Sequence, residues 1–393
     1  MTSIVITAAK RSPIGAFQGS LSGMKSPEIA AHVMKNLYPK EHSLKADEVI
    51  LGCVLSAGIG QAPARQATLL SGMDASTSST TVNKVCGSGM KSLMIAADQL
   101  RLGHAKSIIA GGMESMTNAP YLLLRARSGL RMGHGDIIDH MMWDGLEDAM
   151  HSKNNTSQRK AMGCFADETA SKYGFSRQDQ ENFAIKTFEN YQKAHQKGCF
   201  KHEIVPFSFG ETLFETDEPP SKVKIEKFGK LRPAFHPDGT VTAATSSSIA
   251  DGAAITHLMT EAHAKDQGEK PLAFIKGYTS FSCAPEWFTT APIGAIEKLL
   301  KQTGWSLKDV DLFEINEAFA VVPMAAMHDL KIDPSKVNIH GGACTLGHPI
   351  GASGARIVTT LVHALRTHGL KKGIAAACIG GGEATAMAIE IGA

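Results

Sequence analysis

Short apolar runs alternate with amphipathic stretches over the first 118 residues. Four runs rich in β-branched and small apolar residues predict buried strands, at residues 4–8, 49–55, 80–85 and 107–110. Three stretches have the 3.6-residue spacing of amphipathic helices, at residues 27–37, 63–71 and 89–102. Strands interleaved with helices in this way predict an α/β fold with crossover connections.

The pattern changes between residues 119 and 246 and then returns. This stretch carries long polar runs and a Pro/Lys-rich segment, and only residues 163–197 have the composition of a helical region. The alternation of strands and helices resumes at about residue 270. We therefore expect three parts: an N-terminal half of residues 1–118 plus about 247–269, an inserted loop domain of residues 119–246, and a C-terminal half of residues 270–393.

One helix–strand unit occurs twice. In each copy a Ser-Gly pair opens an amphipathic helix, and a small-residue strand follows that leads to a glycine turn and a glutamate. The spacing from Gly89 to Glu114 is 25 positions, and the spacing from Gly354 to Glu383 is 29. The shared order favours a duplicated α/β domain with the active site between its halves. Coincidence between two ordinary helix–strand units is the alternative.

Composition excludes several classes of protein. A net charge of +2 provides no field for holding a phosphate backbone, so we expect no nucleic-acid partner. No apolar run is long enough for a membrane helix, and the first residues lack the charged start of a signal peptide. Seven scattered cysteines without a CxxC pair are typical of reduced thiols. We expect a cytoplasmic protein.

Cys86 follows a predicted strand and directly precedes a predicted helix. A thiol at a helix start faces unpaired N–H groups and the positive end of the helix dipole, which lower its pKa and favour the thiolate nucleophile. Gly87 and Gly89 leave room for a substrate to approach the sulfur. The equally weighted alternative is a small buried cysteine in a tight turn.

His348 lies among glycines and precedes a proline, so the sequence predicts a loop that presents its imidazole. A neutral imidazole there can accept a proton from a thiol. One alternative is a hydrogen-bonded loop histidine. Another is a metal site of His340, Cys344 and His348, but that spacing aligns ligands only on a helix, which the surrounding glycines disfavour. We expect no metal.

Two further residues lie beside apolar runs. Cys378 ends the strand predicted at residues 374–377 and enters a glycine turn, where it can meet a ligand or simply fill the core. Asn316 stands at the expected start of a helix, either as its N-cap or as a group that orients a water or a substrate oxygen. Signature motifs of nucleotide-binding proteins, serine hydrolases and zinc proteases are absent, and the order Cys86, Asn316, His348 does not fit a papain-like hydrolase.

Six sequence blocks together carry a family resemblance. They are Asn-Lys-Val-Cys-Gly-Ser-Gly-Met-Lys at 83–91, Ala-Gly-Gly-Met-Glu-Ser at 110–115, Arg-Pro-Ala-Phe at 232–235, Asn-Glu-Ala-Phe at 316–319, Gly-His-Pro-Ile-Gly-Ala-Ser-Gly-Ala-Arg at 347–356 and Cys-Ile-Gly-Gly-Gly at 378–382. With these blocks the chain resembles the thiolase family over its whole length. The block that contains His348 is most similar to the acetyl-CoA acetyltransferase, or acetoacetyl-CoA thiolase, type.

The resemblance implies a fold and a reaction. The fold is two duplicated α/β halves in a layered α-β-α-β-α core with an inserted loop domain. The reaction is the reversible condensation of two acetyl-CoA into acetoacetyl-CoA and CoA by a ping-pong route. Cys86 would become acylated while His348 takes its proton, and Cys378 would then remove an α-proton from the second acetyl-CoA. Asn316 would hold a water at the enolate oxygen, and the N–H groups of Cys86 and Gly380 would form a second oxyanion hole.

The resemblance also implies the contacts with CoA, which arrives as a substrate, so that no cofactor is needed. Those positions are Leu146, Phe235, Ala243, Ser247, Ala318 and Phe319. Two positions depart from the usual pattern: Ala161 replaces a histidine beside the pantetheine, and Ala250 replaces an asparagine. Phe288 lies where such enzymes have a bulky side chain near the acyl pocket.

Three alternative functions and the expected oligomeric state complete the predictions from sequence. The nearest rival is a 3-ketoacyl-CoA thiolase with broader chain-length range, serving fatty-acid degradation. From a different class, a thiol redox or sensor protein could use Cys86, but no resolving cysteine is near in sequence. A catalytically inactive scaffold is disfavoured because all four reactive positions are filled. Members of the family are usually dimers or tetramers, so we expect a homo-oligomer, with a homotetramer as the preferred state.

Overall fold

The computed structural model describes residues 2–39, 44–150 and 159–392. Within these ranges ten strands form one mixed sheet, in the order β12-β13-β14-β11-β1-β10-β5-β3-β4 with β2 beside β10. The strands of this sheet are β1 Ile4–Arg11, β2 Gly15–Ala16, β3 Glu48–Gly52, β4 Ser78–Val82, β5 Ser107–Ser115, β10 Ala250–Thr260, β11 Ala273–Ser282, β12 Leu312–Ile315, β13 Lys372–Ile379 and β14 Glu383–Glu390. Two hairpins lie apart from it, formed by β6 Tyr121–Leu122 with β7 Ile138–Asp139 and by β8 Phe207–Phe209 with β9 Thr212–Phe214.

The sheet has two halves of similar topology that meet edge to edge. They join where β1 pairs antiparallel with β11, for example Ile4 with Ile275. From this junction the order is β1, β10, β5, β3 in one direction and β11, β14, β13, β12 in the other, and in both series the last pairing is parallel. A single parallel bridge from Phe313 to Val337 lies where β4 pairs in the first half. This repeated order agrees with the predicted duplication.

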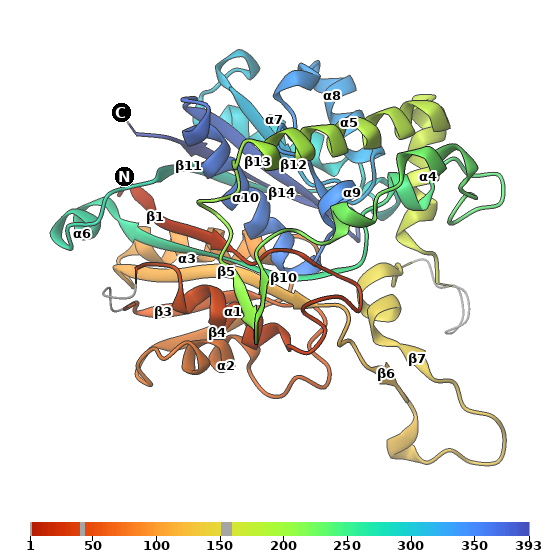
Figure 1. Ribbon diagram of the computed structural model, residues 1–393, viewed down its shortest axis with the longest axis horizontal. Coiled ribbons are helices and arrows are strands. Elements are labelled where there is room, and N and C mark those ends of the chain that lie inside the picture. Colours follow the sequence, from red (N-terminus) through yellow and green to blue (C-terminus); the bar gives the residue numbers. More distant parts are fainter. Residues whose placement is uncertain (1, 40–43, 151–158, 393) are drawn as a thin grey trace.

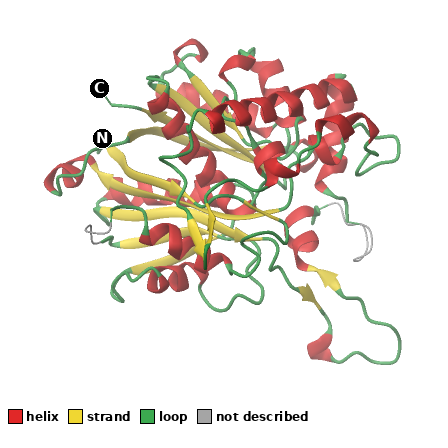
Figure 2. Cartoon of the chain, viewed as in Figure 1, coloured by secondary structure: helices red, strands yellow, loops and turns green. Residues whose placement is uncertain are grey.

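Helices cover and separate the two halves. The α-helices are α1 Ser26–Lys35, α2 Pro63–Leu70, α3 Ser88–Leu102, α4 Met162–Tyr173, α5 Arg177–Gln196, α6 Glu261–Asp266, α7 Ala291–Thr303, α8 Val321–Leu330, α9 Ala343–Leu346 and α10 Ile350–Thr367. Helices α3 and α10 pack against each other between the halves, α1 and α2 cover the N-terminal half, and α7 and α8 cover the C-terminal half (Figures 1 and 2). Three apolar cores lie between these layers. The predicted α-β-α-β-α arrangement is confirmed.

The central helices approach closely because each has a glycine at the crossing. A Cβ atom on Gly89 would lie 2.7 Å from the backbone nitrogen of Ala355, and one on Gly354 would lie 2.4 Å from that of Met90. Gly112 serves a similar purpose in β5, where a Cβ would lie 2.0 Å from the carbonyl oxygen of Gly351. The glycine turn predicted after residue 110 is therefore wrong, because Gly111 and Gly112 continue the strand.

Several predicted boundaries shift for local reasons. Strand β4 ends at Val82 rather than at residue 85, because Val85 has a φ of 45° and turns the chain. The helical region predicted at 163–197 is two helices, α4 and α5, since Gly174 caps the first with a φ of 67°. The side chain of Ser176 then caps α5 by accepting the backbone N–H of Asp179.

Between β5 and β10 the chain leaves the sheet. Helices α4 and α5 lie over the C-terminal half, whereas the β6–β7 hairpin projects from the body (Figure 1). Shorter helical segments are Ala126–Ser128, a π-helix at Met142–Leu146, Pro219–Lys222, Ile225–Lys230, Ala243–Thr245, Pro285–Trp287, Leu307–Asp309 and Pro334–Lys336. The division into an inserted domain and two halves stays a prediction. Across the described ranges no helix is long and apolar enough to cross a membrane.

Candidate active site

A constrained turn between β4 and α3 presents Cys86. The backbone N–H of Lys84 donates to the hydroxyl of Ser88 at 2.8 Å, and that hydroxyl donates to the carbonyl of Val85 at 2.7 Å. These bonds hold Val85 at positive φ, which a β-branched residue adopts only under strain. Cys86 follows, one residue before the N-cap of α3, as the sequence predicts.

The thiol of Cys86 is held as a neutral group. Backbone N–H groups of Gly380 and of Cys86 itself donate to the sulfur and lower its pKa, but burial has the larger effect and raises it to about 11. The predicted lowering of this pKa is therefore wrong, because removal of water outweighs the helix start. The thiolate must be generated by a base when substrate is bound.

His348 is fixed in one tautomer on the loop between α9 and α10. Its Nδ1 lies 2.5 Å from Oγ of Ser353, and that hydroxyl donates its proton to the carbonyl of Pro349 at 2.9 Å. Ser353 must then accept from Nδ1–H, which leaves Nε2 with a free lone pair. Burial, with a smaller contribution from Arg356, lowers the pKa of His348 to about 3, so the imidazole is neutral.

Asn316 faces that lone pair. Its Nδ2 lies 3.5 Å from Nε2 of His348, and its Oδ1 is buried without a hydrogen-bond partner among the described residues. A buried acceptor of this kind favours a bound water or a substrate group beside it. The N-cap alternative is wrong, since α8 begins only at Val321 and Asn316 directly follows β12.

Cys378 and Gly380 lie near Cys86, at the end of β13 and in the turn that follows it. Cys378 belongs to β13, pairs with Ala384 of β14 and is fully buried. Burial raises the pKa of its thiol well above the usual value, and the charge of Cys86 raises it further. That coupling indicates that the two sulfurs lie near each other. Gly380 opens the turn after β13 and directs its N–H at Cys86.

A cavity of about 250 Å³ opens beside Cys86. It is bounded by Val85, Met162, Gly380 and Gly381 on one side and by the segment from Trp143 to Met150 on the other. The guanidinium of Arg159 lies 3.4 Å from the ring centroid of Trp143 and donates to the carbonyl of that residue. Sequence reasoning missed Trp143 and Arg159, because their stacking depends on the π-helix at Met142–Leu146.

The residues expected to contact CoA fall into two groups. Leu146 packs in a small apolar cluster with Val85 and Cys86. The others line an adjacent surface: Phe235 meets Phe319 edge to face at 5.8 Å, Ser247 bonds the carbonyl of Ala318 at 3.0 Å, and Ala243 is exposed nearby on the same loop. The structure thus brings all six to the region around the cavity and the start of α8. Their binding roles stay predictions.

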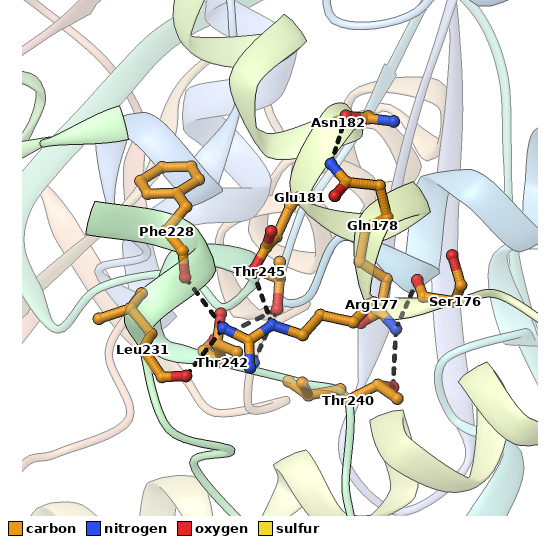
Figure 3. Close-up of polar contacts among 12 residues, drawn as sticks. Ser176, Arg177, Gln178, Glu181, Asn182, Phe228, Leu231, Thr240, Thr242 and Thr245 are labelled. Atoms are coloured by element: carbon orange, nitrogen blue, oxygen red, sulfur yellow. Dashed lines mark hydrogen bonds and ion pairs between the residues drawn. The ribbon is translucent and has the colours of Figure 1, made fainter. Parts of the chain in front are cut away.

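Arg177, which the sequence did not single out, bonds the backbone at Phe228 and Leu231 (Figure 3), a few residues before Phe235. Its Nη2 donates to the carbonyls of Phe228 and Leu231 at 2.9 and 2.8 Å, while Nε donates to Glu181 at 2.7 Å. One guanidinium therefore joins the start of α5 to the segment that precedes Phe235.

Ala250, one of the two departures from the family pattern, and the alternative metal ligands His340 and Cys344 each have specific neighbours. Ala250 is buried in β10, where a Cβ on Gly347 would lie 2.7 Å from its methyl group. His340 contacts His368 with 3.0 Å between ring nitrogens, while Cys344 lies against Glu317. Over the described ranges, no three His, Cys, Asp or Glu side chains cluster in a way that could hold a metal ion.

Glu114 ties the two halves together behind the site. Its carboxylate accepts the backbone N–H groups of Val54 and Leu55 at 3.1 Å and of Gly351 at 2.8 Å. Burial raises its pKa to about 7, although these donors oppose the shift. The loop of His348 is therefore anchored to the N-terminal half, which explains how residues from both halves keep a fixed geometry.

Two family models match the chain. The model described as thiolase, N-terminal domain, matches residues 4–262, and the one described as thiolase, C-terminal domain, matches residues 269–391.

Proteins of known name are similar over nearly the full length. A probable acetyl-CoA acetyltransferase of Dictyostelium discoideum is 44% identical over 99% of this chain and 94% of its own, and an acetyl-CoA acetyltransferase of Pseudomonas aeruginosa is 44% identical over 99% of both. The crystal structure of the Bacillus anthracis acetyl-CoA acetyltransferase aligns with a TM-score of 0.94 at 40% identity, over 100% of this chain and 99% of that one. The Acat5 thiolase of Ascaris suum, solved in complex with coenzyme A, aligns with a TM-score of 0.92 at 37% identity, over 99% of this chain and 100% of that one.

Proposed function

Because the chain belongs to the thiolase family and is therefore an acyltransferase, we propose that it acts as an acetyl-CoA C-acetyltransferase. It condenses two acetyl-CoA into acetoacetyl-CoA and CoA, reversibly. The observation that carries the proposal is the contact between the thiol of Cys86 and the backbone N–H of Gly380, in the turn after the strand that holds Cys378, together with the neutral imidazole of His348, whose Nε2 faces Asn316. The acetyl-CoA acetyltransferase names of the relatives support the substrate.

The first half-reaction forms an acyl-enzyme. Cys86 attacks the thioester carbonyl while Nε2 of His348 accepts the thiol proton. The N–H groups that point at the sulfur of Cys86 are also suited to stabilise the oxyanion of the tetrahedral intermediate. The carbon–sulfur bond to CoA breaks, and the leaving thiolate takes a proton from Cys378.

The second half-reaction forms the carbon–carbon bond. Cys378, now a thiolate, removes an α-proton from the incoming acetyl-CoA, and the enolate attacks the acetyl group on Cys86. The protonated His348 and a water on Asn316 stabilise the enolate oxygen, and the proton on His348 then returns to the released Cys86. All protons balance in this scheme. We propose that no metal or organic cofactor takes part and that CoA enters and leaves as part of substrate and product.

A broader 3-ketoacyl-CoA thiolase of fatty-acid degradation is the second candidate. The packing around Phe288 favours the short-chain reading, because this ring is buried and meets Phe165 and Phe319 edge to face at 6.2 and 6.5 Å. An acyl tail would have to displace this aromatic cluster. A comparison of thiolysis rates for acetoacetyl-CoA and 3-ketooctanoyl-CoA separates the candidates, and we expect the shorter substrate to have the higher kcat/KM.

We also propose a cytoplasmic homo-oligomer, a dimer or a tetramer. The segment between β6 and β7 exposes Leu124, Leu130, Met132 and Ile137, which favours burial against another copy. The edge strand β4 is partly exposed and offers a second surface for pairing. All seven cysteines are free, as expected for a reducing compartment. Light scattering of the purified protein tests the oligomeric state, and a monomer would contradict it.

A further inference from the structure

A second cavity lies far from the catalytic residues and is lined by basic side chains. It has a volume of about 660 Å³, within the range of small-molecule sites, which is about 300–1,000 Å³. Its cationic and imidazole groups come from β1, from the end of α5 and the turn that follows, and from the end of α10. They are Lys10, Lys197, His202, His363 and Arg366. We call this the basic cavity.

Among the residues that the structure describes, no carboxylate side chain lines the basic cavity to balance its charge. Lys10, Lys197 and Arg366 carry three positive charges in a chain whose net charge is +2, and no Asp or Glu is among the lining residues. None of these three forms an ion pair with any residue that the structure describes. A cavity lined by charges of one sign attracts ions of the opposite sign.

Lys10 gives the strongest argument for an anion-binding site in this cavity. It is half-buried on β1, and burial lowers the pKa of its ammonium group, with only Glu203 opposing. Glu203 is already bound to Arg11, with 2.6 Å between Oε1 and Nε. A partly desolvated cation that forms no ion pair with a described residue is destabilising unless an anion joins it.

The neighbouring helix ends explain only part of this arrangement. Helices α5 and α10 end at the cavity, and each C-terminus carries about half a negative charge, which favours Lys197 and Arg366. Lys10 lies on a strand, and His202 lies beyond the helix, so neither complements a helix dipole. His363 adds a ring whose Nε2 bonds the carbonyl of Ala9 at 2.8 Å. The cavity therefore keeps an excess of positive charge.

We propose that the basic cavity binds a small phosphate-bearing anion at a site separate from the catalytic one. Two ammonium groups and a guanidinium around one cavity match the several charged oxygens of a phosphate or diphosphate group. Helix α10 runs from the loop of His348 to Arg366, and sixteen residues of helix span about 24 Å. The two sites share no residue, and occupancy of one leaves the other free.

Pyrophosphate is the probe for this site. Isothermal titration of the native oligomer at constant ionic strength should give saturable binding of one pyrophosphate per chain, and saturating CoA should not abolish it. Lys10→Gln and Lys197→Gln should each weaken binding about tenfold, the loss expected for one charge-assisted contact. Lys10→Arg should keep it. Lys301→Gln, which removes an exposed charge on α7, is the matched control and should have no effect.

Thermal melting distinguishes a ligand-binding lysine from a structural one. Without pyrophosphate, Lys10→Gln should melt at or above the wild-type Tm, because an uncompensated buried charge is removed. With pyrophosphate, the wild type should gain Tm and Lys10→Gln should not. The proposal is overturned by a lack of saturable binding, by displacement of pyrophosphate by CoA, or by unchanged affinity in both lysine variants. None of these outcomes bears on catalysis at Cys86.

Discussion

Nδ1 of His348 lies 2.5 Å from Oγ of Ser353, and the hydroxyl of Ser353 is committed as a donor to the carbonyl of Pro349. The two bonds together determine which imidazole nitrogen carries the proton. They leave Nε2 as the acceptor, on the side where Asn316 lies. Ser353 is thus a positioning residue for His348, the base that we propose for Cys86.

Ser353→Ala should slow acylation by acetyl-CoA about tenfold or more, because His348 loses the bond that selects its tautomer. Ser353→Thr, which keeps the hydroxyl, should recover most of the rate. Rapid-quench measurement of acyl-enzyme formation checks both. Ser92→Ala is the matched control, since Ser92 is also a buried helical serine that bonds only backbone carbonyls. Equal losses in Ser92→Ala and Ser353→Ala would indicate a general effect of packing.

Alkylation of Cys86 by iodoacetamide should rise with pH without a plateau near neutrality. Its pKa of about 11 leaves little thiolate at pH 7, so the rate should increase about tenfold per pH unit up to about pH 10. Mass spectrometry of the peptide containing Cys86 measures this rate separately from other thiols. A plateau between pH 6 and 8 would mean that Cys86 and His348 form a thiolate–imidazolium pair, contrary to the neutral pair described above.

Arg177→Gln should raise the KM for CoA in thiolysis about tenfold and leave kcat within about twofold, since the loop leading to Phe235 loses two hydrogen bonds. Steady-state kinetics at varied CoA measures the split. Arg65→Gln is the control, because Arg65 likewise bonds two loop carbonyls, those of Ala75 and Thr77, away from the site. If Phe235→Ala raises KM and Arg177→Gln does not, the loop holds its position without Arg177.

Phe288→Ala should shift preference toward longer acyl chains. Removal of the ring opens apolar space, where each methylene adds about 0.8 kcal/mol, or about 3 kcal/mol between acetoacetyl-CoA and 3-ketooctanoyl-CoA. The ratio of the two kcat/KM values in one preparation measures the shift and cancels losses of folded enzyme. An unchanged ratio would mean that the acyl group does not approach Phe288.

The hydrophobic pattern predicts the α/β class because its signals are local, whereas the layered arrangement follows only from the family resemblance. The hydrophobic periods at residues 27–37 and 89–102 correspond to α1 and to α3, which begins at Ser88, but the second Ser-Gly pair lies inside α10, which begins three residues before Ser353 at Ile350. Features set by tertiary contacts were predicted wrongly or missed. Gly111 and Gly112 resemble a turn in sequence, yet they lie in a strand because they pair with β10 and β3, and Gly112 leaves room for the start of α10.

The candidate site likewise has residues that the sequence identifies and properties that it does not predict. Sequence blocks identify Cys86, Asn316, His348 and Cys378, and the structure places Asn316 beside His348 and Gly380, in the turn after Cys378, beside Cys86. The state of Cys86 could not be predicted, because its pKa depends on how much water the surrounding layers remove. The role of Arg177 could not be predicted either. The carbonyls of its partners Phe228 and Leu231 lie more than fifty residues away in the sequence, and any residue supplies such a carbonyl.

The central claim is that Cys86 carries the acyl group, and the most direct test is to locate it. Incubation with labelled acetyl-CoA, rapid acid quench, digestion and mass spectrometry should give label on the peptide with Cys86 alone. Cys378→Ala should still acquire this label, since CoA can leave as a thiolate, but should lose acetoacetyl-CoA synthesis and the exchange of acetyl α-hydrogens with solvent. Cys86→Ala should acquire no label. Label on another cysteine, or normal turnover by Cys86→Ala, would contradict the account.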